Sequence, residues 1–173
     1  MTQPRNLRAA VLHIRQLIPP LTIHTPAGRT VRAWDYKQRK NLVIAFLDTD
    51  CAPCESFLQA LASSAASLNE KDAVALVVFL EQPARRFTDS LPAGITVGSD
   101  IPGNSARAFL GEDAFGSHGF VCGGVFVTDR YGELLAQWTI ERHKFPPIAA
   151  TLTALDHAQM ACEECSTPLW APE

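Results

Sequence analysis

Four of the five cysteines in this chain of 173 residues stand in two Cys-x-x-Cys pairs, Cys51/Cys54 and Cys162/Cys165, and Cys122 stands alone. Five cysteines are too few for a disulfide scaffold in a chain of this size, and an odd number leaves at least one unpaired. In a reducing compartment, such pairs are typical of redox-active dithiols or metal sites rather than of structural bridges.

The first pair lies between a predicted buried strand and a predicted helix. Asn41–Leu47 is a continuous apolar run, and apolar residues then recur at helical spacing from Phe57 to Leu68. A helix N-terminus presents unpaired N–H groups and a partial positive charge, which stabilise a thiolate and lower the pKa of a cysteine placed there. We therefore predict that Cys51 is the nucleophile and that Cys54, one turn along, resolves a mixed disulfide.

The elements around this pair indicate an α/β fold. Ala73–Leu80 is a second short apolar run without alternation, so the two runs suit central parallel strands joined by the helix in a βαβ unit. Gly124–Thr128 and Glu133–Thr139 read as an antiparallel hairpin, and a helix follows from Pro146. The expected core is a mixed central β-sheet flanked by helices.

Shorter elements are predicted outside this core. Apolar residues at helical spacing over residues 5–18 predict an amphipathic helix that ends at Pro19-Pro20. Leu21–His24 and Thr30–Ala33 flank a Pro-Ala-Gly turn and predict a small hairpin. The remaining signals predict short helices over Pro83–Leu91 and Ser105–Leu110 and a strand over Ile95–Gly98.

The composition excludes several classes of protein. A hydrophobic share of 47% and a charged share of 19% are typical of a globular chain, and its length fits one domain. Fifteen basic residues against eighteen acidic ones give a net charge of -3 without a basic run, so we expect no nucleic-acid partner. Arginines interrupt the first sixteen residues and no apolar run could span a bilayer, so we expect a cytoplasmic protein without a membrane partner.

Three segments then carry a family resemblance, because they occur in the right order. They are Asp35–Ile44 before the dithiol, Phe46–Cys54 around it, and Val125–Gly132 in the predicted hairpin. In these segments the chain resembles the thioredoxin-like superfamily, in particular its peroxiredoxin-related branch, the redoxin or alkyl-hydroperoxide-reductase/thiol-specific-antioxidant family. The likeness runs from about Leu21 to Leu155.

The resemblance implies a thioredoxin-like domain over residues 21–160, preceded by an N-terminal helical extension over 1–20 and followed by a tail over 161–173. It also implies an antioxidant enzyme with a thiol electron donor and no cofactor. Its substrate would be a disulfide-containing protein or a small thiol or hydroperoxide, and a homodimer is left open.

Three positions depart from the family pattern. Asp50 stands where thioredoxins usually have an aromatic residue, and its carboxylate would either oppose thiolate formation or act as a proton acceptor. Gly123 replaces the cis-proline expected before the Gly124 strand, and so removes a rigid platform that normally faces the dithiol. The spacing of Pro and Thr ahead of a peroxidatic cysteine is absent, since Ile44 and Thr49 do not supply it.

The other cysteines are candidates for auxiliary redox roles. If the alignment holds, Cys122 lies near Cys51, where it would resolve an oxidised Cys51, complete a metal site or stay an inert buried thiol. The helix from Pro146 to Met160 should run about 22 Å away from the dithiol, so Cys162 and Cys165 are expected near the opposite pole. That pair is an accessory dithiol that passes electrons to Cys51/Cys54 within the chain or between subunits, a small metal clip, or a tail without chemistry.

Three functions are therefore open from the sequence. The leading prediction is a thiol–disulfide oxidoreductase that uses Cys51 and Cys54. A peroxiredoxin-like thiol peroxidase with Cys51 as the peroxidatic residue is the close alternative. The third is a non-catalytic metal-binding or interaction module built from Cys51, Cys54 and Cys122.

Overall fold

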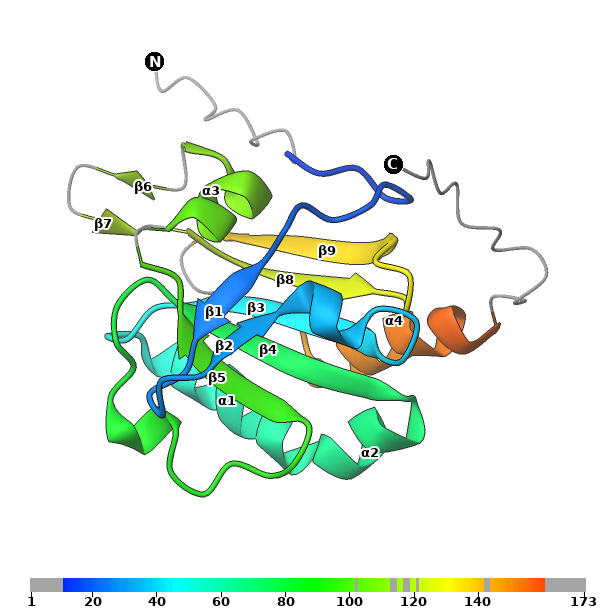
Figure 1. Cartoon of the computed structure of the whole chain (residues 1–173), viewed down its shortest axis with the longest axis horizontal. Helices are drawn as coiled ribbons and strands as arrows, with labels where there is room; N and C mark the ends of the chain where they lie inside the picture. The colour runs from blue at the N-terminus through cyan, green and yellow to red at the C-terminus, as the bar shows by residue number, and fades with distance from the viewer. Residues whose placement is uncertain are drawn as a thin grey trace, which may run out of the picture.

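A seven-stranded mixed sheet forms the centre of the molecule in the computed structural model (Figure 1). The structure describes residues 11–101, 103–112, 115–116, 119–120, 122–141 and 144–160. The strand order is β2-β1-β5-β4-β3-β8-β9. The strands are β1 (Thr22–His24), β2 (Thr30–Arg32), β3 (Asn41–Leu47), β4 (Ala73–Phe79), β5 (Ile95–Ser99), β8 (Cys122–Thr128) and β9 (Leu134–Glu141).

The βαβ unit and the hairpins predicted from the sequence are confirmed. β3 pairs in parallel with β4, and β4 in parallel with β5. β8 runs antiparallel to both β3 and β9, and β1 runs antiparallel to β2 and β5. Every residue of β3 is buried, as expected of a central strand covered on both faces.

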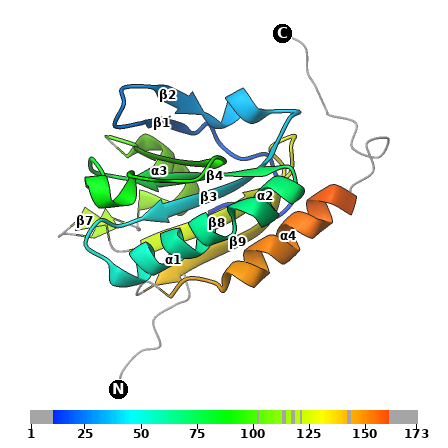
Figure 2. The same cartoon turned by 90° about the horizontal axis from the view of Figure 1, so that it is seen from below.

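Helices cover both faces of the sheet. Figure 2 shows α1 (Ala52–Ser63), α2 (Ala65–Glu70) and α4 (Ile148–Met160) together in front of the sheet. The opposite face is covered by α3 (Asn104–Leu110), by the β1–β2 hairpin and by the 3₁₀ turn η1 (Ala33–Tyr36). Alternate residues of β3 point into two separate apolar clusters, Val43 and Ala45 under α1 and α4, and Ile44 and Phe46 under α3.

The predicted N-terminal helix is wrong for the part that the structure describes. Residues 11–18 form an irregular segment along the edge strand β9, where the N–H of Arg15 donates to the Leu134 carbonyl at 2.8 Å. An exposed strand edge leaves N–H and C=O groups unpaired, and pairing with this segment satisfies them. Leu12 is buried, but Leu17 is 63% exposed. The apolar residues of this segment therefore belong to an irregular stretch of chain that covers the edge of β9, and not to one face of a helix.

Other differences are smaller. The helix predicted from Phe57 to Leu68 is broken at Ser64 into α1 and α2. Pro83–Leu91 contains only the 3₁₀ turn η2 (Arg85–Phe87), and a two-stranded ribbon of β6 (Phe115–Gly116) and β7 (Gly119–Phe120) lies in the glycine-rich region. No helix among the described residues is long and apolar enough to cross a membrane.

Candidate redox site at the start of α1

Cys51 and Cys54 lie where the chain leaves the central strand and enters α1. β3 ends at Leu47, a short loop follows, and Cys51 is the N-cap of α1 with an extended backbone (φ -140°, ψ 102°). Pro53 occupies the first turn, where its missing N–H costs no helical hydrogen bond. The prediction that this pair begins a helix directly after a buried strand is confirmed.

The two cysteines form a disulfide, and their Cα atoms are 5.1 Å apart. The Cys51 sulfur accepts a hydrogen bond from the Cys54 backbone N–H at 3.1 Å, and the Cys54 sulfur accepts one from the Asp48 N–H at 3.4 Å. Cys51 is 7% exposed and Cys54 only 1%. Both residues are therefore buried, Cys51 less deeply than Cys54, and the N-cap position of Cys51 supplies a donor for a thiolate.

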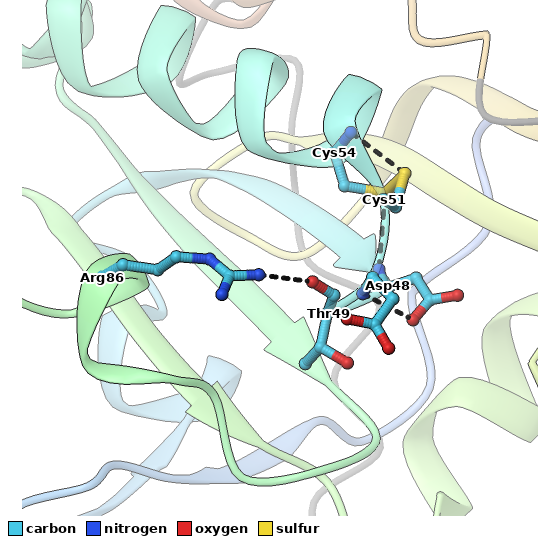
Figure 3. The surroundings of a disulfide bond; sticks show 6 residues. Asp48, Thr49, Cys51, Cys54 and Arg86 are labelled. Carbon is cyan, nitrogen blue, oxygen red and sulfur yellow. Dashed lines mark hydrogen bonds between the residues drawn. A yellow bond between two sulfur atoms is a disulfide. The ribbon is translucent and has the colours of Figure 1, made fainter.

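Arg86 reaches this loop from the connection between β4 and β5. Its Nη2 donates to the Thr49 carbonyl at 3.1 Å (Figure 3). Its Nε lies 4.0 Å from Oε2 of Glu55 in the first turn of α1. Arg86 was not predicted from the sequence as part of this site. Its position in the sequence could have indicated this contact. Arg86 follows the carboxyl end of β4, as Cys51 follows that of β3, and the carboxyl ends of adjacent parallel strands lie at the same edge of the sheet.

Asp50 lies at the surface of the same loop. Its side chain is exposed, and its backbone N–H donates to Oδ1 of Asp48 at 3.4 Å. The role of Asp50 as a proton acceptor stays a prediction.

Gly123 lies in β8, beside the end of β3, as the alignment implied. A Cβ at this position would be 2.8 Å from the Phe46 carbonyl oxygen and 3.6 Å from the ring of Phe145. That ring stacks on Phe57 of α1 with a centroid distance of 4.9 Å and an interplanar angle of 21°. The site thus has a close backbone approach and an aromatic stack where the family pattern has a proline.

An open, largely apolar groove of about 570 Å³ adjoins the dithiol. Ala52 and Pro53 line its near end, and Phe145 with the two following prolines lines the far side. The groove therefore begins at the residues between the two cysteines and runs along the start of α4.

The auxiliary cysteines lie in different places. Cys122 begins β8 opposite Glu141, two residues before Gly124, which pairs with Phe46. Its backbone therefore lies at the end of β3 that leads to Cys51, while its side chain is outside the described residues.

Cys162 and Cys165 also lie outside the described residues. α4 ends beside the starting ends of β3 and β4, where Lys71 pairs with Asp156 and the Gln159 side chain donates to the Glu70 carbonyl at 3.1 Å. The predicted direction of α4, away from the dithiol, is confirmed. Among the residues that the structure describes, no three His, Cys, Asp or Glu side chains are placed to hold a metal ion.

Comparisons with known proteins agree with this fold. The sequence model of the AhpC/TSA family matches residues 14–137. A candidate thiol:disulfide interchange protein DsbE from Chlorobium tepidum is 23% identical, with 87% of this chain and 97% of that chain covered and a TM-score of 0.63. AhpC from Mycobacterium tuberculosis is 16% identical, with 88% and 97% covered and a TM-score of 0.69.

A yeast mitochondrial 1-Cys peroxiredoxin is 15% identical over 86% of this chain and 77% of that chain, with a TM-score of 0.72. No curated protein sequence matches the chain. The structural neighbours share the thioredoxin-like fold, and the family match indicates thiol-based redox chemistry.

Proposed function

The chain belongs to the AhpC/TSA family of thiol-dependent redox enzymes, and we propose that it is a thiol–disulfide oxidoreductase with Cys51 as nucleophile and Cys54 as resolving thiol. One observation carries this proposal. Cys51, which is 7% exposed, is the N-cap of α1, and the more deeply buried Cys54 lies one turn along within bonding reach of it.

The reaction needs only these two thiols and a substrate disulfide. The Cys51 thiolate attacks one substrate sulfur, which breaks the substrate S–S bond, forms a mixed disulfide and releases the other sulfur as a thiolate that takes up a proton. The Cys54 thiolate then attacks the Cys51 sulfur and releases the second substrate thiol. The substrate gains two electrons, the enzyme keeps a Cys51–Cys54 disulfide, and a thiol donor restores the dithiol.

The hydrogen bonds of the oxidised state support the same division of roles. When Cys51 is reduced, the Cys54 N–H at 3.1 Å is already placed to donate to its thiolate. The Cys54 sulfur accepts the longer Asp48 N–H bond at 3.4 Å, and Cys54 is nearly inaccessible. A substrate therefore meets Cys51, and Cys54 meets only the mixed disulfide.

The apolar groove beside the dithiol favours a protein substrate over a small peroxide. Its volume of about 570 Å³ would accept a short apolar segment of chain next to a substrate disulfide. Hydrogen peroxide is small and polar, so it would gain no binding energy from an apolar groove.

Reduction of a protein disulfide tests the proposal. The chain, reduced and then mixed with oxidised insulin, should release insulin thiols, and Cys51→Ser should abolish the release. Cys54→Ser should accumulate a mixed disulfide that mass spectrometry places on Cys51. Hydrogen peroxide turnover with a thiol donor and no insulin reduction would contradict the proposal and favour a thiol peroxidase.

A further inference from the structure

A second, separate cavity of about 230 Å³ lies at the other end of the sheet from the dithiol. It is formed between residues 17–22, η1, the start of β3 and the turn that joins β8 to β9. Figures 1 and 2 both show η1 at the same end of the molecule as that turn. Since seven-residue β3 spans roughly 23 Å, this cavity and Cys51 are at opposite poles. The proposed redox reaction makes no use of the cavity.

The most buried part of the cavity lining is apolar. It consists of Leu21 and Leu42, which are 2% and 3% exposed, and of Ala33. Pro19 and Pro20 form another part of the lining, and a proline has no backbone N–H that could bind water or a polar ligand. A polar atom buried against these side chains would lose its hydrogen bonds to water. The buried part of the cavity therefore favours an apolar group.

Backbone hydrogen bonds hold the walls of the cavity together. The N–H of Gln38, in the loop after η1, donates to the Arg130 carbonyl at 2.6 Å. The N–H of Ile18 donates to the carbonyl of Gly132, in the same turn as Arg130, at 2.9 Å. Two segments that are distant in the sequence are thus tied to the turn between β8 and β9. The cavity is therefore formed before a ligand binds, as is usual for small-molecule sites.

Positive charge gathers at this cavity, although the net charge of the chain is -3. Among the described residues, the lining contains four basic side chains, those of Arg32, Lys37, Lys40 and Arg130. Its one carboxylate, that of Asp129, is buried and accepts the N–H groups of Tyr131 and Glu133 at 2.9 Å each. Lys40 also pairs at 3.2 Å with the exposed Asp72, which does not line the cavity. Because the turn itself binds the Asp129 carboxylate, the lining keeps an excess of positive charge that favours an anion.

Apolar surface and positive charge meet at Trp34. This side chain lines the cavity and is 62% exposed, and Leu17, which also lines it, is 63% exposed. The Lys37 ammonium lies 4.0 Å from the centroid of the Trp34 ring. A ligand with an apolar body and one negative charge would contact the indole ring and the ammonium together. Exposed apolar side chains beside a preformed cavity are typical of a binding site.

The size of the cavity sets the size of the ligand. An apolar cavity of about 150 Å³ is enough to hold benzene, so about 230 Å³ suits two fused rings such as naphthalene. We propose that this cavity binds a small aromatic carboxylate, with the ring against Leu21 and Leu42 and the carboxylate among the four cations of the lining. A nucleobase is a poor match, because its polar ring atoms would be buried against apolar side chains. This inference concerns a site remote from the dithiol and does not depend on the proposed function.

Titration of the full, isotope-labelled chain with naphthoate, followed by the NMR shifts of the backbone amides, tests this proposal. Naphthamide and naphthylmethylamine carry the same ring with no charge and with a positive charge. We expect naphthoate to shift the amides of residues 33–42 and 130–132, and to bind at least about tenfold more tightly than either of the other two ligands. Added salt should weaken the binding of naphthoate and leave that of naphthamide unchanged, because salt screens the cations of the lining.

Two variants separate the contribution of charge from that of the apolar wall. Lys37→Met removes a cation but keeps a chain of similar length, so it should weaken the binding of naphthoate at least about fivefold and leave that of naphthamide unchanged. Trp34→Ala removes part of the wall and should weaken the binding of both ligands. The control Lys144→Met removes the same charge from an exposed position next to Phe145, and should bind naphthoate as the wild type does.

Four results would overturn the proposal. Naphthoate could cause no saturable shift of the cavity amides, or could bind no more tightly than naphthamide. It could shift only the amides around Phe57 and Phe145, which would place it in the groove beside the dithiol. The cavity amides could shift on dilution of the protein without ligand, which would assign the cavity to a second copy of the chain. The amide spectrum of each variant verifies that the domain stays folded.

Discussion

Substitution of Gly123 by alanine should destabilise the protein more than substitution of its neighbour Gly124. The added Cβ at 123 would be 2.8 Å from the carbonyl oxygen of Phe46, a distance that real Cβ atoms essentially never show. That oxygen belongs to β3, which is paired on both sides, with β4 and with β8. The backbone therefore has no direction in which it can yield without breaking ladder hydrogen bonds.

The neighbouring glycine provides a matched control in the same strand. A Cβ at Gly124 would also be crowded, 2.7 Å from Cδ2 of Leu110 and 2.8 Å from Cε2 of Phe126. Both atoms are the far ends of side chains, which can rotate away at a smaller cost. The contrast between the two variants thus separates a clash with backbone from a clash with side chains.

Overpacking of a core costs about 1–3 kcal/mol, and we place Gly123→Ala near 3 and Gly124→Ala near 1 on that scale. For a chain of this length, about 3 kcal/mol corresponds to a fall in Tm of roughly 6–12 °C. Denaturant unfolding of both variants, with Cys51 and Cys54 oxidised throughout, gives the two free energies directly. If Gly123→Ala is as stable as Gly124→Ala, the rigid approach of β3 to β8 is not what requires glycine there.

Three further predictions concern the site and its supports. Arg86→Ala should slow protein-disulfide reduction about 2–5-fold with little change in stability, because the Arg86 side chain that bonds the loop before Cys51 is half exposed. The control Arg85→Ala should change neither the rate of reduction nor the stability. Phe145→Ala should cost about 1–3 kcal/mol of stability, because it removes the stack on Phe57, and should raise KM for a protein disulfide more than for a small one. Asp100→Ala should cost about 1–3 kcal/mol in denaturant unfolding, because its buried carboxylate accepts two N–H bonds from the first turn of α3.

The parts of the fold that were predictable are those in which local pattern and burial agree. β3 and β4 are apolar runs covered on both faces, so composition alone identifies them, and the helix between them places the dithiol. Residues 5–18 carry a helical pattern too, but for residues 11–18 the unpaired edge of β9 offers hydrogen bonds that no local signal reveals. The edge cover depends on a strand more than a hundred residues away.

The candidate site also contains features that local sequence predicts and features that only the assembled fold creates. Cys51 and Cys54 are three residues apart, so their relation to one helix turn could be predicted from spacing. Arg86 approaches Thr49 only because β3 and β4 are adjacent parallel strands, and the two residues are 37 positions apart in the sequence, so no local pattern reveals the contact. Gly123 could be aligned to the family pattern, but the close approach of Phe46 and the ring of Phe145 exist only in the assembled structure.

The choice between a reductase and a peroxidase therefore depends on what surrounds the dithiol and not on the dithiol itself. Either a substrate disulfide or a hydroperoxide would oxidise Cys51, and in both cases Cys54 would close the same bond with it. The distinction must lie in which oxidant reaches Cys51 and is held there. The apolar groove that begins at Pro53 provides a surface on which a polypeptide could bind. The stack of Phe145 on Phe57 makes one side of that groove rigid. A variant that alters this side of the groove should therefore change the reaction with proteins while leaving the reaction with a small disulfide nearly intact.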